Sequence, residues 1–288
     1  MNEIVLLACG KINLSLDIVG LREDGYHLMD MVMQSVSLAD RVTLRRAKEI
    51  SVITGGGIPA DERNTAFKAA KVFFAETGVP GGCEITVEKN IPSEAGMGGG
   101  SADAAAVLIG LDQMYGTDLP VDKLMDMGLR VGADVPFCLI GGTALVQGIG
   151  ERVASVSPMP DCHILLVKPS FGISTGAAFR HFDETGVSVH PDNAALLAAM
   201  EAGDLSSMDR FMANVLEESA ASPEIEALRE TIAAQGAEAA LMTGSGSVVF
   251  GLFSDEEKAR AAAEKVSGLG KVFLARPVPA GTEILSVS

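Results

Sequence analysis

Residues 92–106 join a glycine-rich loop directly to an alanine-rich helix. Glycine has no β-carbon, so such a loop can adopt positive φ and bring its amides close to an anion. The helix adds unpaired N–H donors and the positive end of its dipole. Ser101 is predicted to cap this helix. The residues spaced as on a buried helix face are Ala104, Val107, Leu108 and Leu111. The segment therefore predicts a phosphate-binding loop.

Other kinds of glycine loop are the alternatives. A Walker loop requires Gly-Lys-Ser/Thr, whereas Gly100 is followed by Ser101 and Ala102, and a Rossmann fingerprint requires a glycine at Ser101. A turn that only lets a strand and a helix pack closely would also contain glycines. The unbroken run Gly98–Gly100 before a capped helix favours phosphate binding.

Length and charge limit the classes of partner. A chain of 288 residues is long enough for two domains. Its net charge of −16 argues against long-range attraction to nucleic acid or to anionic lipid. We therefore expect no nucleic-acid and no membrane partner. An anionic ligand would be captured locally, by loop amides, a few cations and a metal ion.

The cysteines and the N-terminus indicate a cytoplasmic protein. Cys9, Cys83, Cys138 and Cys162 are scattered without zinc spacing, which predicts reduced, mostly buried thiols. No basic segment precedes the apolar residues 4–9, so a signal peptide is not expected. No segment has the roughly 18 or more apolar residues that a membrane span needs.

Periodicity along the first half predicts strands and helices in alternation. Residues 12–18 alternate as in a half-buried strand, with Lys11 and Asn13 together on its polar face. Further strands are predicted near 42–44, 50–53 and 83–87, and helices near 101–115 and 121–131. A helix with clear ends lies between Asn64 as its cap and the stop signals Gly78 and Pro80; its predicted core face is Ala66, Ala69, Ala70 and Phe73.

The pattern changes after the breaks at 148–150 and 158–160. A strand at 162–167, several helices between 174 and 235, strands near 239–242 and 248–253, a helix from Asp255 and a strand near 271–275 form a βα-ββαβ order. That order is typical of a ferredoxin-like split βαβ unit. We therefore predict an α+β protein with domains at 1–157 and 158–288.

Two charged residues are candidates for catalysis. Asp134 stands in a turn before Pro136, which disfavours helical geometry at Val135, so its carboxylate can be directed into a cleft. Asp134 is equally a suitable N-cap for the apolar segment that follows. Lys11 is either a solvated lysine of an edge strand or a functional cation near the anion loop.

Two loops are candidates for ligand binding. Tyr26 and His27 follow Asp24-Gly25, and loop aromatics often stack on ligands, although simple packing explains them as well. A second glycine loop, residues 243–247, is either a plain hairpin or a segment that closes over substrate or phosphate.

Taken together, the motifs resemble those of the GHMP kinase superfamily, and the match extends over nearly the whole chain. Within it, the chain is most similar to the branch that phosphorylates the 2-hydroxyl of 4-diphosphocytidyl-2-C-methyl-D-erythritol (CDP-methylerythritol) in non-mevalonate isoprenoid biosynthesis. The segments that carry this resemblance are residues 11–14, 22–27, 92–106 and 132–137. The resemblance implies an N-terminal domain like the second domain of ribosomal protein S5, a ferredoxin-like C-terminal domain, and an active site between them.

The resemblance also implies roles for individual residues. Asp134 would be the general base, with Lys11 beside it stabilising the charged aspartate and the developing alkoxide. ATP, carrying Mg²⁺, would lie near Asn64 and Lys89, with its phosphates on Pro92, Ser93, Glu94, Ala95, Gly96, Met97, Gly98, Gly99, Gly100, Ser101 and Ala102. Besides Asp134, the substrate would contact Asn13, Tyr26, His27, Thr175 and Phe179, with Tyr26 and His27 reading cytosine.

Two residues depart from the commoner family pattern. Asp103 stands where asparagine is frequent, and Ser247 stands where proline or alanine often follows the Gly-Ser-Gly of the second loop. The alternative functions are another small-molecule kinase of this superfamily, of the mevalonate or homoserine type, or a nucleotide-binding module without catalysis. The metal ligands and the oligomeric state do not follow from the sequence.

Overall fold

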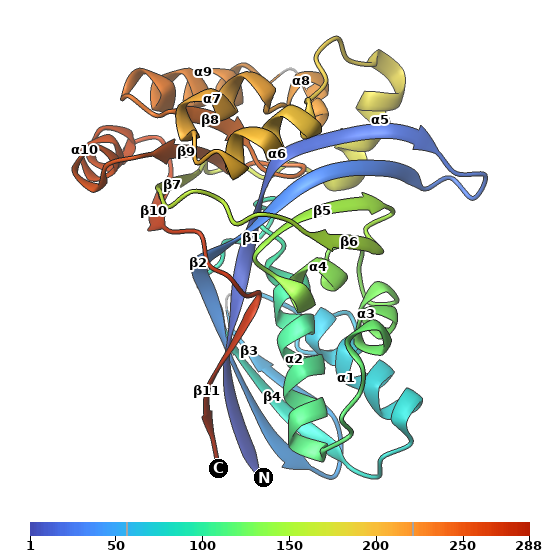
Figure 1. The fold of residues 1–288 in the computed structure, drawn as a ribbon. Coiled ribbons are helices and arrows are strands. Elements are labelled where there is room, and N and C mark those ends of the chain that lie inside the picture. Colours follow the sequence, from blue (N-terminus) through green and yellow to red (C-terminus); the bar gives the residue numbers. More distant parts are fainter. Residues whose placement is uncertain (56, 221) are drawn as a thin grey trace.

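The computed structural model of the chain describes residues 1–55, 57–220 and 222–288, which form two β-sheets with helices packed on them (Figure 1). The first sheet has the order β11-β1-β2-β4-β3, and β2 also pairs with β5, which pairs with β6. Its strands are β1 (Glu3–Leu21), β2 (His27–Ala47), β3 (Ser51–Thr54), β4 (Gly82–Glu88), β5 (Thr143–Gly148), β6 (Arg152–Ser155) and β11 (Thr282–Val287).

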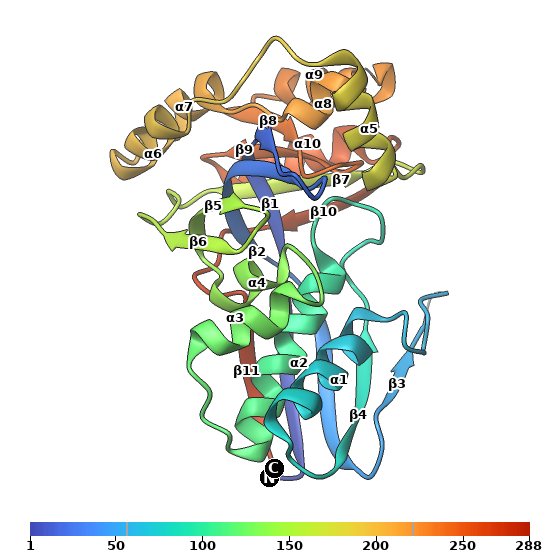
Figure 2. The same cartoon turned by 90° about the vertical axis from the view of Figure 1, so that its right-hand side faces the viewer.

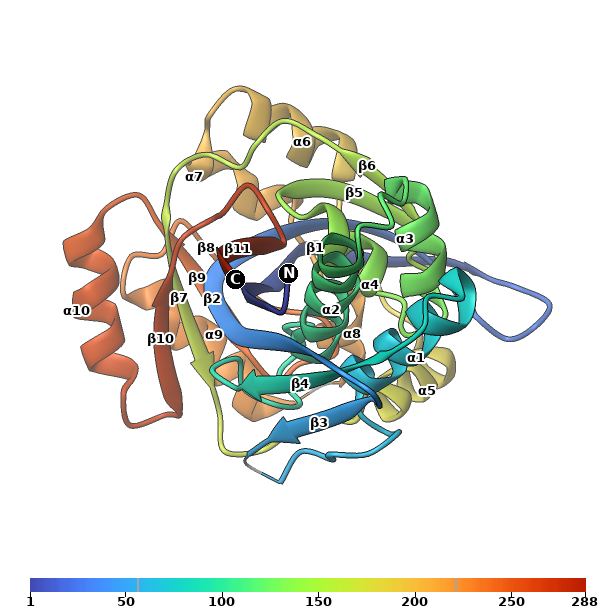
Figure 3. The ribbon, with the colours of Figure 1, turned by 90° about the horizontal axis from the view of Figure 1, so that it is seen from below.

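The helices of the first half gather on one side of β1, β2 and β4 (Figure 3). They are α1 (Thr65–Thr77), α2 (Gly99–Tyr115), α3 (Val121–Leu129) and α4 (Val135–Ile140). The ends predicted for α1 are confirmed: the Asn64 side chain accepts a hydrogen bond from the amide of Ala66, and Gly78 ends the helix in the left-handed conformation. The alanines of α1 and α2 let these helices lie close to the sheet, because small side chains leave little space between backbones.

The second sheet has the order β10-β7-β9-β8, with every pair antiparallel. Its strands are β7 (His163–Lys168), β8 (Ala239–Met242), β9 (Val249–Phe253) and β10 (Lys271–Ala275). The helices that accompany it are α5 (Thr175–Thr185), α6 (Asn193–Glu201), α7 (Leu205–Met208), α8 (Val215–Ala220), α9 (Pro223–Ala234) and α10 (Glu256–Val266). The βα-ββαβ order is confirmed, and Asp255 caps α10 through its side chain.

Strand β11 lies outside the strands predicted from sequence. It leaves the second half of the chain and pairs antiparallel with β1, so the two termini lie side by side (Figure 2). The amide of Asn2 donates to the carbonyl oxygen of Ser288 at 2.6 Å. The division at residue 157 remains a prediction; the last strand after it belongs to the first sheet.

Strand β1 is longer and more buried than its predicted segment. The prediction of a half-buried strand is wrong between residues 11 and 16, because loops and helices of the second half cover the polar face as well as the apolar one. Lys11 is 4 % exposed and Asn13 is 1 % exposed. The register between β1 and β2 shifts at Cys9/Lys11 and at Asn13/Ser15. Such bulges redirect side chains and free backbone groups from the ladder.

The cysteines of the described chain are free and buried, as predicted. Burial raises the pKa of the Cys83 and Cys162 thiols to about 12. Among the described residues, no helix is long and apolar enough to cross a membrane.

Candidate active site

A cleft of about 1040 Å³ lies where the glycine loop, β1 and α5 meet. Its walls come from both halves of the chain. The residues predicted to act in catalysis or binding that line it are Lys11, Asn13, Tyr26, His27, Asn64, Lys89, residues 92–101, Asp134, Thr175 and Phe179. Ala102 is the exception: its side chain is fully buried behind the loop, and its amide donates to the carbonyl oxygen of Gly98 at 2.8 Å. Ala102 thus lies outside the lining of the cleft, and its contact with phosphate stays a prediction.

The loop before α2 presents its amides to the cleft. Within the described residues, the backbone amides of residues 96–101 donate no hydrogen bond to a backbone or side-chain acceptor. Gly98 is the N-cap, with φ +66°, and as a glycine it has no side chain to cap the helix. The predicted cap Ser101 is therefore wrong, because the helix begins at Gly99, two residues earlier. A left-handed glycine at the cap leaves the donors of the first turn for an anion.

The bulges at Cys9/Lys11 and Asn13/Ser15 connect β1 to both glycine loops. The amide of Lys11 donates to the carbonyl oxygen of Met97 at 3.0 Å, and the amide of Asn13 donates to the hydroxyl of Thr243 at 2.9 Å. The side chains of Lys11 and Asn13 lie on the same face, where the ammonium donates to the amide oxygen of Asn13 at 2.7 Å. The strand thus carries a buried ammonium to the middle of the glycine loop of residues 92–101.

Lys11 and Asp134 form the central ion pair of the cleft. The Lys11 Nζ lies 3.4 Å from the Asp134 Oδ2, and the Asp134 side chain is 33 % exposed. Asp134 occupies the N-cap position of α4 but makes no side-chain cap hydrogen bond, so its carboxylate remains directed toward Lys11. Contrary to expectation, Val135 is helical. Pro136 is tolerated because the first turn of a helix has no partner for its missing N–H.

The second glycine loop docks on the first. A β-carbon built at Gly96 would overlap the carbonyl oxygen of Thr243, so only glycine permits this close approach. The Thr243 hydroxyl lies 3.3 Å from the Gly96 carbonyl oxygen. The hydroxyls of Thr175 and Ser245 lie 2.8 Å apart and tie the start of α5 to the same loop. Residues 243–247 are therefore more than a hairpin, because they join the two halves at the cleft.

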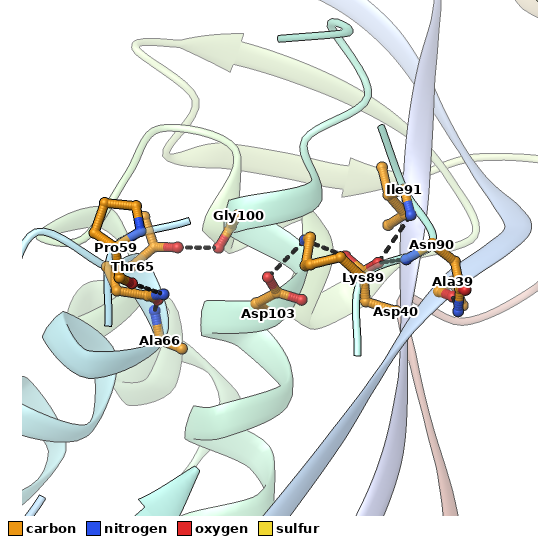
Figure 4. A network of polar contacts seen from close by, with 11 residues as sticks. Ala39, Asp40, Pro59, Thr65, Ala66, Lys89, Asn90, Ile91, Gly100 and Asp103 are labelled. Carbon is orange, nitrogen blue, oxygen red and sulfur yellow. Dashed lines mark hydrogen bonds and ion pairs between the residues drawn. The ribbon is translucent and has the colours of Figure 1, made fainter. Parts of the chain in front are cut away.

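Behind the phosphate loop, Lys89 lies between two buried aspartates (Figure 4). Its Nζ donates a hydrogen bond to the Asp40 Oδ2 and another, of 2.7 Å, to the Asp103 Oδ2. Asp40 also accepts from the amides of Asn90 at 2.6 Å and Ile91 at 2.8 Å. The Asp103 Oδ1 is buried and has no partner among the described residues. Two carboxylates thus share one ammonium, so one negative charge is uncompensated whenever both are ionised.

The pKa values of this cluster follow from that imbalance. Burial raises the pKa of Asp103 to about 7; the attraction of Lys89 opposes the rise and the repulsion of Asp40 adds to it. Burial lowers the pKa of Lys89, but the two carboxylates outweigh this effect and leave the pKa above its ordinary value. The departure from asparagine at position 103 therefore places a second acid around the same lysine.

We expect Asp103→Asn to remove a pH dependence of stability. In the unfolded chain an aspartate has a pKa of about 3.9. Because the folded pKa is raised to about 7, the folded state holds an extra proton between these values, and stability falls as pH rises through this window. The slope for one proton is about 1.4 kcal/mol per pH unit. Urea unfolding at pH 5 and pH 8 should show that the free energy of unfolding falls less between these pH values in Asp103→Asn than in the wild-type protein. An equal fall in both would contradict the raised pKa of Asp103.

The far end of the cleft is aromatic. The rings of His27 and Phe179 stack with centroids 4.8 Å apart, and Phe182 meets His27 edge-on at 6.4 Å. Tyr26 lines the cleft and is 60 % exposed. Phe179 and Phe182 come from α5, whereas Tyr26 comes from the turn before β2 and His27 is the first residue of β2, so this end too is built from both halves.

Several cleft residues were not predicted from sequence. Thr65, whose hydroxyl donates to the carbonyl oxygen of Gly100 at 2.7 Å, directly follows the cap of α1. Behind the cleft lining, the fully buried Asp40 was not predicted either, because its position in a strand does not identify Lys89 as its partner. Arg63 and Ser174 also line the cleft.

Comparison with known proteins decides the family. The GHMP kinases N terminal domain matches residues 64–142, and the GHMP kinases C terminal domain matches residues 196–272. A 4-diphosphocytidyl-2-C-methyl-D-erythritol kinase from Carboxydothermus hydrogenoformans is 41 % identical over 287 residues, covering 98 % of this chain and 100 % of its own. The chain belongs to the 4-diphosphocytidyl-2-C-methyl-D-erythritol kinase family of the GHMP kinases.

Other relatives of this GHMP kinase support the same family assignment. A kinase of the same name from Syntrophomonas wolfei is 43 % identical, over 91 % of this chain and 94 % of its own. The crystal structure of a 4-(cytidine 5'-diphospho)-2C-methyl-D-erythritol kinase superposes with a TM-score of 0.81 at 33 % identity, covering 95 % of this chain and 98 % of that one. A homoserine kinase from Cytophaga hutchinsonii, with a TM-score of 0.80 at 20 % identity, covers 99 % and 98 % and shares the fold.

Proposed function

We propose that this GHMP kinase transfers the γ-phosphoryl group of ATP to the 2-hydroxyl of CDP-methylerythritol, with Asp134 as the general base. The family assignment supports the reaction. The observation that supports the base is the 3.4 Å pair of Lys11 and Asp134 beside the amides of residues 96–101. A carboxylate, an ammonium and a set of free amides, far apart in sequence, thus face one cleft.

The chemistry needs mainly positioning and charge neutralisation. Asp134 takes the proton of the substrate hydroxyl while the hydroxyl oxygen attacks the γ-phosphorus of ATP. The bond between the γ-phosphorus and the bridging oxygen breaks, and ADP leaves with that oxygen. Lys11 holds Asp134 in place and neutralises the developing alkoxide. The amides of residues 96–101 and the N-terminus of α2 bind the phosphate oxygens. Asn13, which accepts a hydrogen bond from Lys11, would contact the sugar alcohol.

We include Mg²⁺ in this proposal as an ion carried by the ATP phosphates. Within the described residues, no group of three acidic, cysteine or histidine side chains could hold a metal by itself. Mg²⁺ commonly keeps several waters and uses one or two carboxylates with the substrate phosphates. The hydroxyl of Ser101, which lines the cleft in the first turn of α2, suits an ion held mainly by phosphate oxygens and waters. The ion would neutralise phosphate charge during transfer.

A substrate panel tests the proposed reaction. The purified protein should transfer phosphate from ATP to CDP-methylerythritol with a kcat/KM at least about a hundredfold above that for mevalonate or homoserine, since only the first carries a base for the aromatic end of the cleft. ADP release from each acceptor gives the rates. Comparable turnover of all three would overturn the substrate assignment, and ATP binding without turnover of any would indicate a non-catalytic module.

A further inference from the structure

Asp183 contacts the residue that we expect to read the base. His27 opens β2 and Asp183 lies near the end of α5, so the pair joins the two halves of the chain. The His27 Nε2 lies 2.7 Å from the Asp183 Oδ1. An ionised carboxylate can only accept a hydrogen bond, so the proton of this bond must reside on Nε2. In a neutral imidazole, the other nitrogen, Nδ1, is then an acceptor.

The surroundings of the imidazole keep it in this orientation. One face stacks on Phe179 at an interplanar angle of 29°, and Phe182 packs edge-on at 84°. The His27 side chain is 15 % exposed. Nδ1 makes no hydrogen bond within the described part of the chain, whereas Nε2 is occupied by Asp183. Nδ1 is therefore the polar atom of this ring that remains for a ligand in the cleft.

We propose that Asp183 is a positioning residue that fixes the tautomer of His27 and thereby makes the site select a base with an amino group at position 4. This inference rests on the proposed function, in which the substrate carries cytosine. The 4-amino group of cytosine donates to an acceptor such as Nδ1. The 4-oxo group of uracil is an acceptor and would leave two acceptors facing each other, which costs affinity.

Substitution of Asp183 tests the selection. An asparagine either accepts or donates, so Asp183→Asn makes both tautomers of His27 available. We expect the ratio of kcat/KM for CDP-methylerythritol to that for its uridine counterpart to fall about threefold to tenfold, the range of one hydrogen bond. The change should lie in KM, with kcat for CDP-methylerythritol nearly unchanged, because Asp183 does not touch the reacting atoms.

Two further variants separate this role from a general effect on α5. Asp183→Glu still offers only acceptors and should retain most of the preference for cytosine. Glu184→Gln removes a neighbouring exposed charge that bonds no described residue, and it should leave the ratio unchanged. Equal ratios in the wild-type protein and Asp183→Asn would overturn the proposal, as would an equal fall in Glu184→Gln.

The tautomer can be observed without activity. The chain has 4 histidines, so ¹⁵N NMR of the imidazoles at pH 8, with His27 assigned by its loss in His27→Gln, is tractable. We expect the Nε2–H form in the wild-type protein and a mixture in Asp183→Asn. A wild-type Nδ1–H form would overturn the proposal. Failure of the wild-type protein to phosphorylate CDP-methylerythritol would instead overturn the proposed function, and the assignment of the base with it, while the spectrum still decides the tautomer.

Discussion

Asp134→Asn should lower kcat at least about a hundredfold while ATP still binds. An asparagine of the same shape cannot take the hydroxyl proton, and general base catalysis contributes about 10² to 10⁴ in rate. Binding should persist because the loop amides of residues 96–101 do not depend on this side chain. Steady-state kinetics with CDP-methylerythritol give kcat, and isothermal titration gives the Kd for ATP, which we expect to change less than about threefold.

The matched control for this variant is Asp126→Asn. Asp126 lies on the exposed side of α3 and bonds no described residue, so the same chemical change there should leave kcat unaltered. Near-normal turnover in Asp134→Asn would show that another group takes the proton. A large loss of ATP affinity would instead assign Asp134 mainly to the metal-bound nucleotide.

Gly96→Ala should strongly destabilise the protein. Gly96 has φ +71°, and an added β-carbon would overlap the carbonyl oxygen of Thr243. The left-handed conformation costs about 1–2 kcal/mol for a residue with a side chain, and overpacking typically costs a further 1–3 kcal/mol. We therefore expect a loss of about 2–5 kcal/mol in urea unfolding. Separation of the two glycine loops should also reduce turnover, because it moves the phosphate amides away from Lys11.

Gly116→Ala provides the comparison at the other end of α2. Gly116 has φ +63°, but a β-carbon there would meet nothing within 4 Å. Only the backbone cost of about 1–2 kcal/mol should appear, with activity retained. Equal destabilisation by the two substitutions would mean that the loops separate without a measurable loss in the free energy of unfolding. That result would contradict the close docking of Gly96 on Thr243.

Local patterns were sufficient for most individual elements. The cap and stop residues of α1 are confirmed because Asn64 and Gly78 act through bonds to their near neighbours. The ferredoxin-like strand order is also confirmed, since each strand has its own periodicity. Strand β11 escaped prediction because it has no strong alternation of buried residues; most of its side chains are exposed, and pairing with β1 defines it.

The candidate site shows the same division. The glycine run predicted a phosphate loop, and residues 92–101 line the cleft. Ser101 was misplaced as a cap because the sequence does not reveal that Gly98 takes the left-handed conformation. Lys11 and Asn13 were correctly placed on one face, but their burial depends on segments about 230 residues away, such as Thr243.

The sequence by itself determined the α+β order, the family and the place of the glycine loop that we propose to bind phosphate, because these depend on local periodicity, on glycine and on motifs that remain together along the chain. Only the tertiary structure decided which charges meet. Lys89 lies between Asp40 and Asp103, and His27 contacts Asp183, whereas the pairing of Lys11 with Asp134 was already implied by the family resemblance. The physical reason is that side-chain contacts act over a few ångströms, so partners distant in sequence are selected by strand pairing, bulges and the docking of loops.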